Sequence, residues 1–493
     1  MGLGREEFFE IHEAQGLALT FDDVRLATRM SDVTREQTDI SSRFTEGVPL
    51  KAPIVSAAMR DVTDSKMATV LAKNGGIGVI PCTQDLEAQR KEVRAVKHAM
   101  NGFIDKPITV HPLQTMSSIE SDRVSYASDF YTFPVVDVGG KLLGLITHND
   151  FRFSRQSPAS TAAENMKRTE ELEVSTGETT IEDAYRIMRE KRVTTLPVVD
   201  EAGLLQGMYL FSDVARIIED RNSMYNVDSL GRLVVAAAVP TDPTEAVERW
   251  MQLRNYADAV VIDSAQGDSE FASIKTLVAL REAFSDAQIM IGNITNPGSV
   301  ERLVNEGANG IKVGQGGGSI CTTRVVTGIG VPQLTAVYRC FSEARKFDIP
   351  ICSDGGVTNH GDIPIAAAVG AASVMMGNML AGTDEAPGRI IERPDGTIVK
   401  QYRGEGSADA LAENRGSRQR YQQDGGVLAP EGVSGGVPTK GSADTLIQVM
   451  ISYLRRSMSY QGARNLSELG VKAEFERVTG NGLRESGAHD IYY

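Results

Sequence analysis

One glycine-rich segment carries a cysteine in a setting where a thiol could act as a nucleophile. The run from Gly314 to Thr323 reads GQGGGSICTT, with four glycines in its first five positions. Glycines permit unusual backbone torsions and leave N–H and C=O groups open to a phosphate or a monovalent cation. Cys321 lies on this polar loop near expected helix N-termini, where the pKa of a thiol can fall and the thiolate can attack. The alternative is a glycine-rich turn with an incidental cysteine.

Two further glycine-rich turns follow apolar runs. They are Cys352-Ser353-Asp354-Gly355-Gly356 and Met376-Gly377-Asn378. Barrel enzymes often bind phosphate in the loops after their last two strands. Asp354 could accept hydrogen bonds from two ribose hydroxyls, although a helix N-cap is the simpler alternative.

The segments that must position these turns alternate between strand-like and helix-like patterns. The runs expected to form strands are Pro53–Met59, Gly76–Ile80, Leu233–Val239, Asp258–Asp263, Gln288–Ile294, Gly310–Gly314, Ile349–Asp354 and Ser373–Gly377. Between them, Ser269–Ala283 and Pro297–Glu306 carry apolar residues at helical spacing. Eight buried strands separated by helices predict an α/β protein with a parallel (β/α)₈ TIM barrel. A doubly wound α/β sheet is the competing fold.

A duplication interrupts this pattern after the second strand. FPVVD at Phe133–Asp137 recurs as LPVVD at Leu196–Asp200, and the same offset relates Gly144 to Gly207 and Asp150 to Asp213. Each unit is expected to contain two strands, such as Leu142–Thr147, and then a helix opened by an Asp N-cap. Ser121–Tyr131 and Thr180–Lys191 are expected to be equivalent helices. Matching strand, glycine and aspartate positions at one offset indicate two copies of a module.

Composition restricts the class of protein. The net charge of −14 provides no electrostatic footprint for nucleic acid. No apolar stretch has the roughly 20 residues of a membrane-spanning helix, and the acidic N-terminus lacks a signal pattern, so we expect a cytoplasmic protein. The four cysteines show neither CxxC pairing nor a metal-ligand spacing, so they form no disulfide framework.

Four motifs together resemble one family. GGGSICTTR, SDGG at Ser353–Gly356, VMMGNMLAG at Val374–Gly382 and YRGEGS at Tyr402–Ser407 are similar to the IMP dehydrogenase and GMP reductase superfamily. Arg420-Tyr421, followed by PEGV at Pro430–Val433, resembles the mobile flap of IMP dehydrogenases, and GMP reductases lack the Arg-Tyr pair. The duplicated unit resembles tandem CBS modules, which commonly bind adenine nucleotides. Three positions depart from the common pattern: Glu405 where many relatives carry Met, Gly317 where many have Pro or Ser, and Asn378 in place of Ser.

The resemblance implies a domain division. The catalytic barrel takes residues 1–104 and 223–493, with a flap over about 401–441. The CBS modules take residues 105–222, as about 105–155 and 165–222. A homotetramer is expected, with an octamer as the alternative, and an adenine or guanine nucleotide is the expected regulator at the CBS pair.

The resemblance also implies a reaction. Cys321 adds to IMP, NAD⁺ accepts a hydride, and water activated by Arg420 with Thr323, Tyr421 and Glu431 releases XMP. This is a step of purine and GMP biosynthesis. A GMP reductase with CBS modules and an inactive nucleotide sensor are the alternatives.

The resemblance further implies the residues at each subsite. The implied IMP contacts are Ser319, Asp354, Gly356, Gly377, Asn378, Tyr402, Gly404, Glu405 and Gly406. The implied NAD contacts are Asp263, Ser264, Asn293 and Gly314. The implied K⁺ ligands are carbonyl groups of Gly316, Gly318 and Cys321, with Glu485, Ser486 and Gly487 from a neighbouring subunit.

Overall fold

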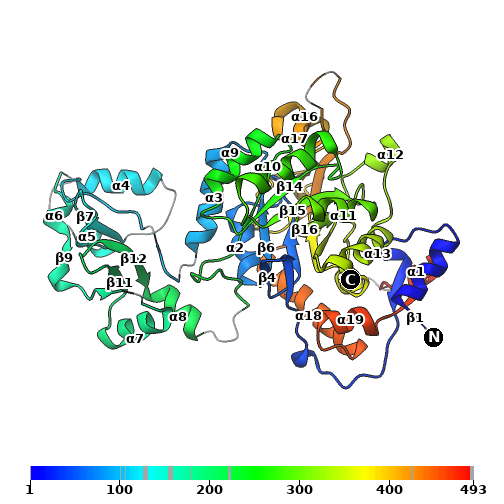
Figure 1. The fold of residues 1–493 in the computed structure, drawn as a ribbon, viewed down its shortest axis with the longest axis horizontal. Helices are drawn as coiled ribbons and strands as arrows, with labels where there is room; N and C mark the ends of the chain where they lie inside the picture. The colour runs from blue at the N-terminus through cyan, green and yellow to red at the C-terminus, as the bar shows by residue number, and fades with distance from the viewer. Residues whose placement is uncertain are drawn as a thin grey trace. The chain divides into compact units, whose positions relative to one another are not determined.

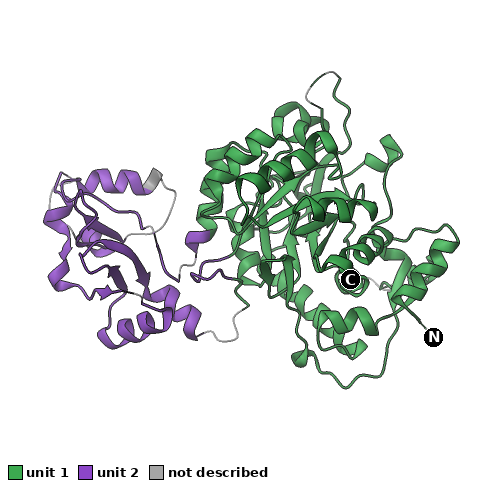
Figure 2. Cartoon of the chain, viewed as in Figure 1, with its two compact units in different colours: residues 1–96, 224–226, 234–493 green, residues 97–223, 227–233 purple. Residues whose placement is uncertain are grey.

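The chain forms two compact units, shown in Figure 2. The computed structural model describes residues 2–99, 102–105, 107–125, 132–153, 159–177, 179–219, 224–423, 425 and 427–488. Unit 1 comprises Met1–Val96, Met224–Asn226 and Val234–Tyr493, and unit 2 comprises Lys97–Ser223 and Val227–Leu233. Within the described ranges, no helix is both long enough and apolar enough to cross a membrane.

Unit 1 is built on a closed barrel of eight parallel strands, in the order β13-β14-β15-β16-β17-β18-β5-β6. The strands are β5 (Ile54–Ser56), β6 (Ile77–Ile80), β13 (Ala236–Val239), β14 (Ala259–Asp263), β15 (Ile289–Ile294), β16 (Gly310–Val313), β17 (Ile351–Asp354) and β18 (Ser373–Met376). Each lies inside one of the eight expected runs. Because β18 pairs with β5 and β6 with β13, the sheet has no edge, which confirms the barrel and excludes the doubly wound alternative.

Helices surround the strands (Figure 1). They are α2 (Ser65–Lys73), α3 (Leu86–Ala99), α9 (Pro243–Leu253), α10 (Lys275–Ala283), α11 (Gly298–Asn305), α13 (Gln333–Ala344), α14 (Asp362–Val369) and α18 (Ala443–Gln461). Helix α18 contacts both α14 and α2 and so completes the ring. The expected helix over Ser269–Ala283 is a π-helical turn, Glu270–Ile274, followed by α10.

Smaller elements of unit 1 lie outside the barrel. They are β1 (Leu3–Gly4), α1 (Arg5–Ala14), β2 (Val24–Leu26), β3 (Ser42–Thr45), β4 (Val48–Leu50), α12 (Thr323–Thr327), α15 (Asn378–Ala381), α19 (Leu466–Lys472), β22 (Glu474–Arg477) and α20 (Gly480–Glu485). A three-stranded antiparallel sheet, β19 (Ile390–Glu392), β20 (Ile398–Arg403) and β21 (Ser434–Pro438), follows α15. The segment between β20 and β21, residues 404–433, carries α16 (Ala408–Glu413) and α17 (Arg415–Arg420) and is called the flap below.

Unit 2 repeats one arrangement twice. The first copy contains α4 (Met116–Ser125), β7 (Phe133–Val136), β8 (Leu142–Ile146), α5 (His148–Phe153), α6 (Ala162–Asn165) and β9 (Lys167–Arg168). The second contains β10 (Ser175–Thr176), α7 (Ile181–Lys191), β11 (Thr195–Val199), β12 (Leu205–Leu210) and α8 (Phe211–Glu219). The hairpins carry a register shift at the same place, Val135/Val136 in one and Val198/Val199 in the other.

The turns of the two hairpins match as well. Asp137 Oδ1 accepts the Lys141 N–H at 2.9 Å, and Asp200 Oδ1 accepts the Leu204 N–H at 2.8 Å. The repeated aspartate therefore fixes an equivalent turn in each copy, because its carboxylate satisfies backbone donors that the turn leaves open. These equivalent bulges and turns confirm the duplication expected from the sequence.

Two details of the expected repeat are corrected. Asp150 and Asp213 do not occupy the N-cap position, because α5 begins at His148 and α8 at Phe211. Asp150 instead accepts the N–H of Thr147 at 2.6 Å from within the first turn, in the manner of a capping box. The helix expected over Ser121–Tyr131 begins earlier, at Met116, and residues 126–131 lie outside the described ranges.

Candidate active site

The loops after the barrel strands and the flap enclose a cavity of about 120 Å³. Its walls come from β5, β14, β15, β16 and β17 on the barrel side and from the flap opposite. Of the residues expected at the site, those that line the cavity are Ser264, Asn293, Gly314, Gly316, Gly318, Cys321, Thr323, Asp354, Tyr402, Gly404, Glu405, Arg420, Tyr421 and Glu431. Segments as far apart in the chain as Met59 and Gly432 thus meet at one barrel mouth.

Cys321 begins a short hydrogen-bonded chain that ends in a carboxylate. Its Sγ lies 3.2 Å from Thr323 Oγ1, and the Thr323 hydroxyl donates to Glu431 Oε2 at 2.8 Å. Backbone pairing fixes this geometry, since the Thr322 N–H donates to the Glu431 carbonyl and the Val433 N–H to the Ile320 carbonyl. A thiol, a hydroxyl and a carboxylate in sequence can pass a proton away from the reacting sulfur or from a nearby water.

The remaining cysteines lie in different surroundings. Burial raises the pKa of Cys340 and of Cys352 to about 12, so both remain thiols at neutral pH. Desolvation, reinforced by the Asp263 carboxylate, also raises the pKa of Cys82 to about 12. Only Cys321 among the four lines the cavity, which singles it out as the candidate nucleophile.

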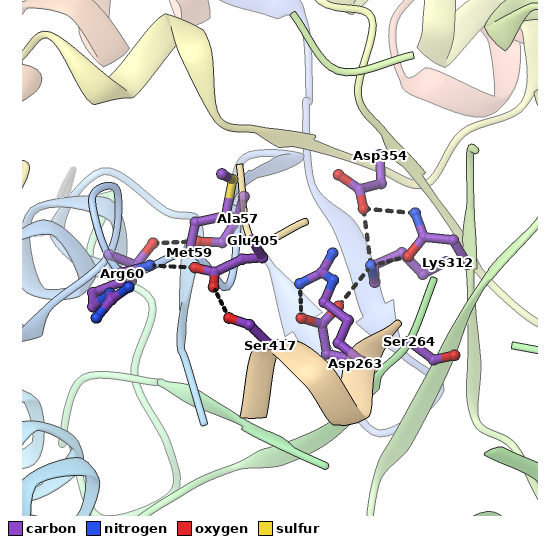
Figure 3. Close-up of polar contacts among 12 residues, drawn as sticks. Ala57, Met59, Arg60, Asp263, Ser264, Lys312, Asp354, Glu405 and Ser417 are labelled. Atoms are coloured by element: carbon purple, nitrogen blue, oxygen red, sulfur yellow. Dashed lines mark hydrogen bonds and ion pairs between the residues drawn. The ribbon is translucent and has the colours of Figure 1, made fainter. Parts of the chain in front are cut away.

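A buried lysine connects the polar ends of three neighbouring strands (Figure 3). Lys312 of β16 is 1% exposed, and its Nζ lies 2.9 Å from Asp354 Oδ2 and 3.2 Å from Asp263 Oδ1. It also donates to Asn293 Oδ1. Asn293 Nδ2 in turn donates to Asp354 Oδ2 at 2.8 Å and to the Gly314 carbonyl at 2.6 Å. The network gathers the carboxylates of Asp354 and Asp263 around one ammonium group.

The charges in this network support one another. Burial alone raises the pKa of Asp354, but the Lys312 ammonium outweighs it and the pKa lies below its usual range. Burial likewise lowers the pKa of Lys312, whereas Asp354 and Asp263 raise it above its usual value. Asp354 is therefore a carboxylate at neutral pH, able to accept hydrogen bonds from the hydroxyls of a ligand.

The flap contributes a second cation. Arg420, the last residue of α17, forms an ion pair with Asp263. Burial lowers the pKa of Arg420, but Asp263 and other nearby acidic groups outweigh that effect and raise the pKa above its ordinary value. In this arrangement of the flap Arg420 is a guanidinium cation, and it occupies the carboxylate of Asp263.

Two glycines are required by close approaches of tyrosines. A Cβ at Gly377 would lie 2.5 Å from the hydroxyl of Tyr402, and a Cβ at Gly406 would lie 2.6 Å from the Tyr421 ring. Any side chain at either position would displace an aromatic ring from the cavity wall. The resemblance implied ligand contacts at both glycines, and their observed role is to make room for these two rings.

The other expected residues lie away from the cavity wall. Ser319 is exposed, Gly356 packs near Gln333, and the backbone carbonyl of Asn378 accepts Lys440 Nζ at 2.6 Å. Ser486 and Gly487 line a different cavity of about 630 Å³ beside His360, and Glu485 ends α20. A single chain therefore does not bring these last three residues to the glycine-rich loop.

Sequence reasoning missed Lys312. The only signal was a lysine inside an otherwise apolar run, Gly310-Ile311-Lys312-Val313. A charged side chain is unusual in a strand that is expected to be buried. An unpaired charge in such a strand is costly, so a partner carboxylate could have been expected on an adjacent strand.

Replacing Lys312 by methionine is expected to destabilise unit 1 by about 3–5 kcal/mol, because two buried carboxylates lose their common cation. Asp354 would lose the group that lowers its pKa, and burial would then raise that pKa. The stabilisation that wild-type Asp354 provides is present above the pKa of an unfolded aspartate, and it is lost as pH falls through the lower folded value. The acid unfolding of the variant, followed by circular dichroism, should therefore lack this contribution: its deficit in stability relative to the wild type should be largest near neutral pH and should shrink as pH falls.

Lys97→Met provides the matched control. Lys97 is 2% exposed and pairs with Asp228 at 2.9 Å in unit 2. It should lower stability without changing how ligands bind at the barrel mouth. Equal acid unfolding of Lys312→Met and the wild type would show that Lys312 does not hold Asp354 in its charged form.

The chain is similar over nearly its whole length to proteins of one family. A family model described as IMP dehydrogenase / GMP reductase domain matches residues 18–489. Inosine-5'-monophosphate dehydrogenases from Halalkalibacterium halodurans and Bacillus subtilis are 39% and 37% identical, covering 96% of this chain and 96% of each relative. A crystal structure of a GMP reductase from Trypanosoma brucei with guanosine 5'-monophosphate has a TM-score of 0.88 at 35% identity, covering 97% of this chain and 100% of that one.

Proposed function

Because the chain belongs to the IMP dehydrogenase/GMP reductase family, we propose that it oxidises IMP to XMP with NAD⁺, a step of guanine nucleotide synthesis. The observation that carries this proposal is the Cys321–Thr323–Glu431 chain facing Arg420 and Tyr421 across one cavity. It combines a nucleophile for the first half of the reaction with groups that can orient a water molecule and accept its proton in the second half.

The first half is a covalent addition. The Cys321 thiolate attacks C2 of the hypoxanthine ring, and a C–S bond forms while C2 becomes tetrahedral. The hydrogen on C2 then leaves as a hydride, which NAD⁺ accepts when bound. In this proposal Asp354 and Tyr402 hold the nucleotide. Asp263, Ser264, Asn293 and Gly314 hold the dinucleotide.

The second half is hydrolysis. Water attacks C2, the C–S bond breaks, and the thiolate of Cys321 is restored with XMP as the product. Thr323 and Glu431 provide a route for the proton of that water. Arg420 and the dinucleotide compete for Asp263, so the flap is expected to close only after NADH has left.

The nearest alternative is a GMP reductase, which the similarity to the Trypanosoma brucei structure supports. Absorbance at 340 nm separates the two activities: IMP with NAD⁺ should produce NADH, whereas GMP with NADPH should leave NADPH unchanged. Consumption of NADPH without NADH production would assign the reductase activity. A catalytically inactive sensor would show neither reaction, although the intact site argues against it.

We also propose a potassium requirement and a homotetramer. Gly316 has a φ of +70°, and the Gly318 carbonyl accepts the Cys321 N–H at 3.0 Å. The loop therefore makes a tight turn, and backbone carbonyl groups in such a turn can coordinate a cation. Glu485, Ser486 and Gly487 lie at another cavity of their own chain, so a neighbouring subunit would supply the remaining ligands.

Potassium is expected to activate turnover, with little support from Na⁺ or Li⁺, because carbonyl groups on a flexible loop suit a large monovalent cation. The measurement is the NADH production rate after exhaustive exchange into each chloride salt at constant ionic strength. Truncation after Arg484 should abolish the K⁺ dependence together with most activity. An equal rate in all three salts would contradict the proposed site.

Unit 2 is proposed to be a tandem CBS pair that binds a purine nucleotide. The lining of its cavity of about 490 Å³ includes polar groups at the start of β11 and the start of α8, among them Thr194, Ser212 and Asp213. A Trypanosoma brucei GMP reductase has been solved with guanosine 5'-triphosphate, at 30% identity to this chain and a TM-score of 0.77.

Calorimetric titration with ATP and with GTP is expected to detect binding of one or both. Asp213→Ala should weaken that binding by about tenfold, since one hydrogen bond to a charged group is lost. Asp200→Ala, which alters the hairpin turn of the same copy, is the control. Unchanged affinity in Asp213→Ala would remove this cavity as the nucleotide site.

A further inference from the structure

A buried carboxylate lies at the root of the flap. Glu405 lies two residues after the end of β20 and is 5% exposed. Its Oε1 accepts the backbone N–H of Arg60 at 3.0 Å, and its Oε2 accepts the hydroxyl of Ser417 at 2.8 Å. Figure 3 shows Glu405 between these two donors, one on the loop after β5 and one on α17.

The two donors differ in how firmly they are held. The neighbour of Arg60, Asp61, accepts Arg403 Nε at 2.9 Å and an Arg403 terminal nitrogen at 3.0 Å. This bidentate pair ties the loop after β5 to β20, at the base of the flap. Ser417, by contrast, belongs to the short helix α17 within the flap itself. Glu405 therefore joins a fixed part of the barrel to the part that has to move.

The bond to Ser417 is one of several that hold α17 and Arg420 against the barrel; the Ala265 N–H also donates to the Arg420 carbonyl at 3.1 Å, and the Thr241 hydroxyl to the Gln419 carbonyl at 3.2 Å. Ser417 is fully buried, and Arg420 follows it by three residues in the same helix, about one turn. The two residues therefore lie on neighbouring faces of α17, one bonded to Glu405 and the other paired with Asp263. Release of the Ser417 end would weaken the hold on α17 and so favour withdrawal of Arg420 from Asp263.

A carboxylate buried here is stable only while both oxygens are bonded, because an unpaired buried charge is expensive. With the flap open, Oε2 would face the cavity and water. With the flap closed, it has Ser417. The carboxylate thus strengthens the closed state in a way that a methionine could not.

We propose that Glu405 is a positioning residue that latches α17 in the closed state, and so sets the balance between the flap and the dinucleotide at Asp263. The inference rests on the proposed function, in which the flap closes for hydrolysis and opens for NAD⁺. Breaking the latch is expected to favour NAD⁺ at the expense of the flap, by about tenfold for one hydrogen bond to a charged acceptor.

The primary test is Ser417→Ala. Inhibition of steady-state turnover by excess NAD⁺ should begin at an NAD⁺ concentration about tenfold lower than in the wild type. The ratio of the hydrolysis rate to the hydride-transfer rate, from rapid mixing, should fall. Trypsin should cut the flap faster after the arginines of α17, a readout that does not depend on activity. Ser442→Ala is the matched control, since Ser442 donates to Glu385 at 3.3 Å outside the cavity.

Substitutions of Glu405 complete the test. Glu405→Met should produce the same changes, and adding Ser417→Ala to it should produce no further change, because both act through one bond. Glu405→Gln should restore most of the closed state, since its amide can accept from Arg60 and donate to Ser417. If Glu405→Met does not fold, Ser417→Ala and Glu405→Gln decide the question.

The outcomes separate the latch from the proposed function. Wild-type NADH production with unchanged NAD⁺ inhibition and unchanged flap cleavage in Ser417→Ala would overturn the latch alone. A wild type that produces no NADH from IMP would overturn the proposed function, and faster trypsin cleavage in Ser417→Ala would still support the latch.

Discussion

Replacing Cys321 by alanine is expected to lower turnover of IMP by at least ~10⁴-fold, because the reaction loses the atom that forms the covalent bond. IMP should still bind, since the groups placed to hold the nucleotide, Asp354 and Tyr402, are unaffected. The two effects together distinguish a nucleophile from a residue that only supports the loop. Turnover is measured as NADH production, and IMP affinity by calorimetry.

Cys340→Ala is the control for this substitution. Cys340 is fully buried in α13, and its pKa of about 12 keeps it protonated, so its replacement should affect stability slightly and turnover little. Intact-protein mass spectrometry of the wild type, quenched during turnover, should show an adduct of nucleotide mass that is absent from Cys321→Ala. Substantial turnover by Cys321→Ala would exclude the covalent mechanism.

Much of the barrel could be predicted because its strands are buried on both faces. Each of the eight runs is mostly apolar, and all eight strands formed within the expected ranges. Their order around the barrel follows from chain order and closure, which places the polar residues after β14, β15, β16 and β17 at one mouth. The cavity residues were expected from resemblance, whereas their convergence has this physical cause.

The contacts between distant segments could not be predicted in the same way. Lys312 meets Asp354 because β16 pairs with β17, and it reaches Asp263 past β15, which lies between β16 and β14. The spacing of residues along the chain does not express these cross-strand contacts. The link from Glu405 to Ser417 requires the fold of the flap, which has no strong helical periodicity. The error at Asp150 is of another kind, since an aspartate serves a helix start equally well at the N-cap or in the first turn.

In the closed flap Arg420 is positively charged, and this charge limits how it can act in hydrolysis. Asp263 keeps its guanidinium protonated, so a proton from the attacking water cannot pass to Arg420 while that pair exists. Thr323 and Glu431 form a connected route beside Cys321 that can accept it. We infer that Arg420 either leaves Asp263 to act as the base or stays charged and orients the water for the Thr323–Glu431 route.

Replacing Arg420 by alanine is expected to slow hydrolysis by ~10²–10⁴-fold and to leave hydride transfer nearly untouched. The reason is that in the proposed cycle NAD⁺ takes the carboxylate of Asp263 that Arg420 occupies in the closed flap, so Arg420 is absent from the site during the first half of the reaction. Rapid mixing with IMP and NAD⁺ should show a burst of about one NADH per active site and then a stall. Mass spectrometry of the stalled enzyme should find the adduct on Cys321.

The control is Arg415→Ala, which replaces an exposed arginine in the same helix and should turn over normally. Glu431→Gln in the Arg420→Ala background tells the two roles apart: a further large loss of hydrolysis means that Glu431 carries the proton, and no further loss means that Arg420 was the base. If hydride transfer and hydrolysis slowed equally in Arg420→Ala, Arg420 would serve binding or structure, and the two halves of the reaction would not divide at the flap.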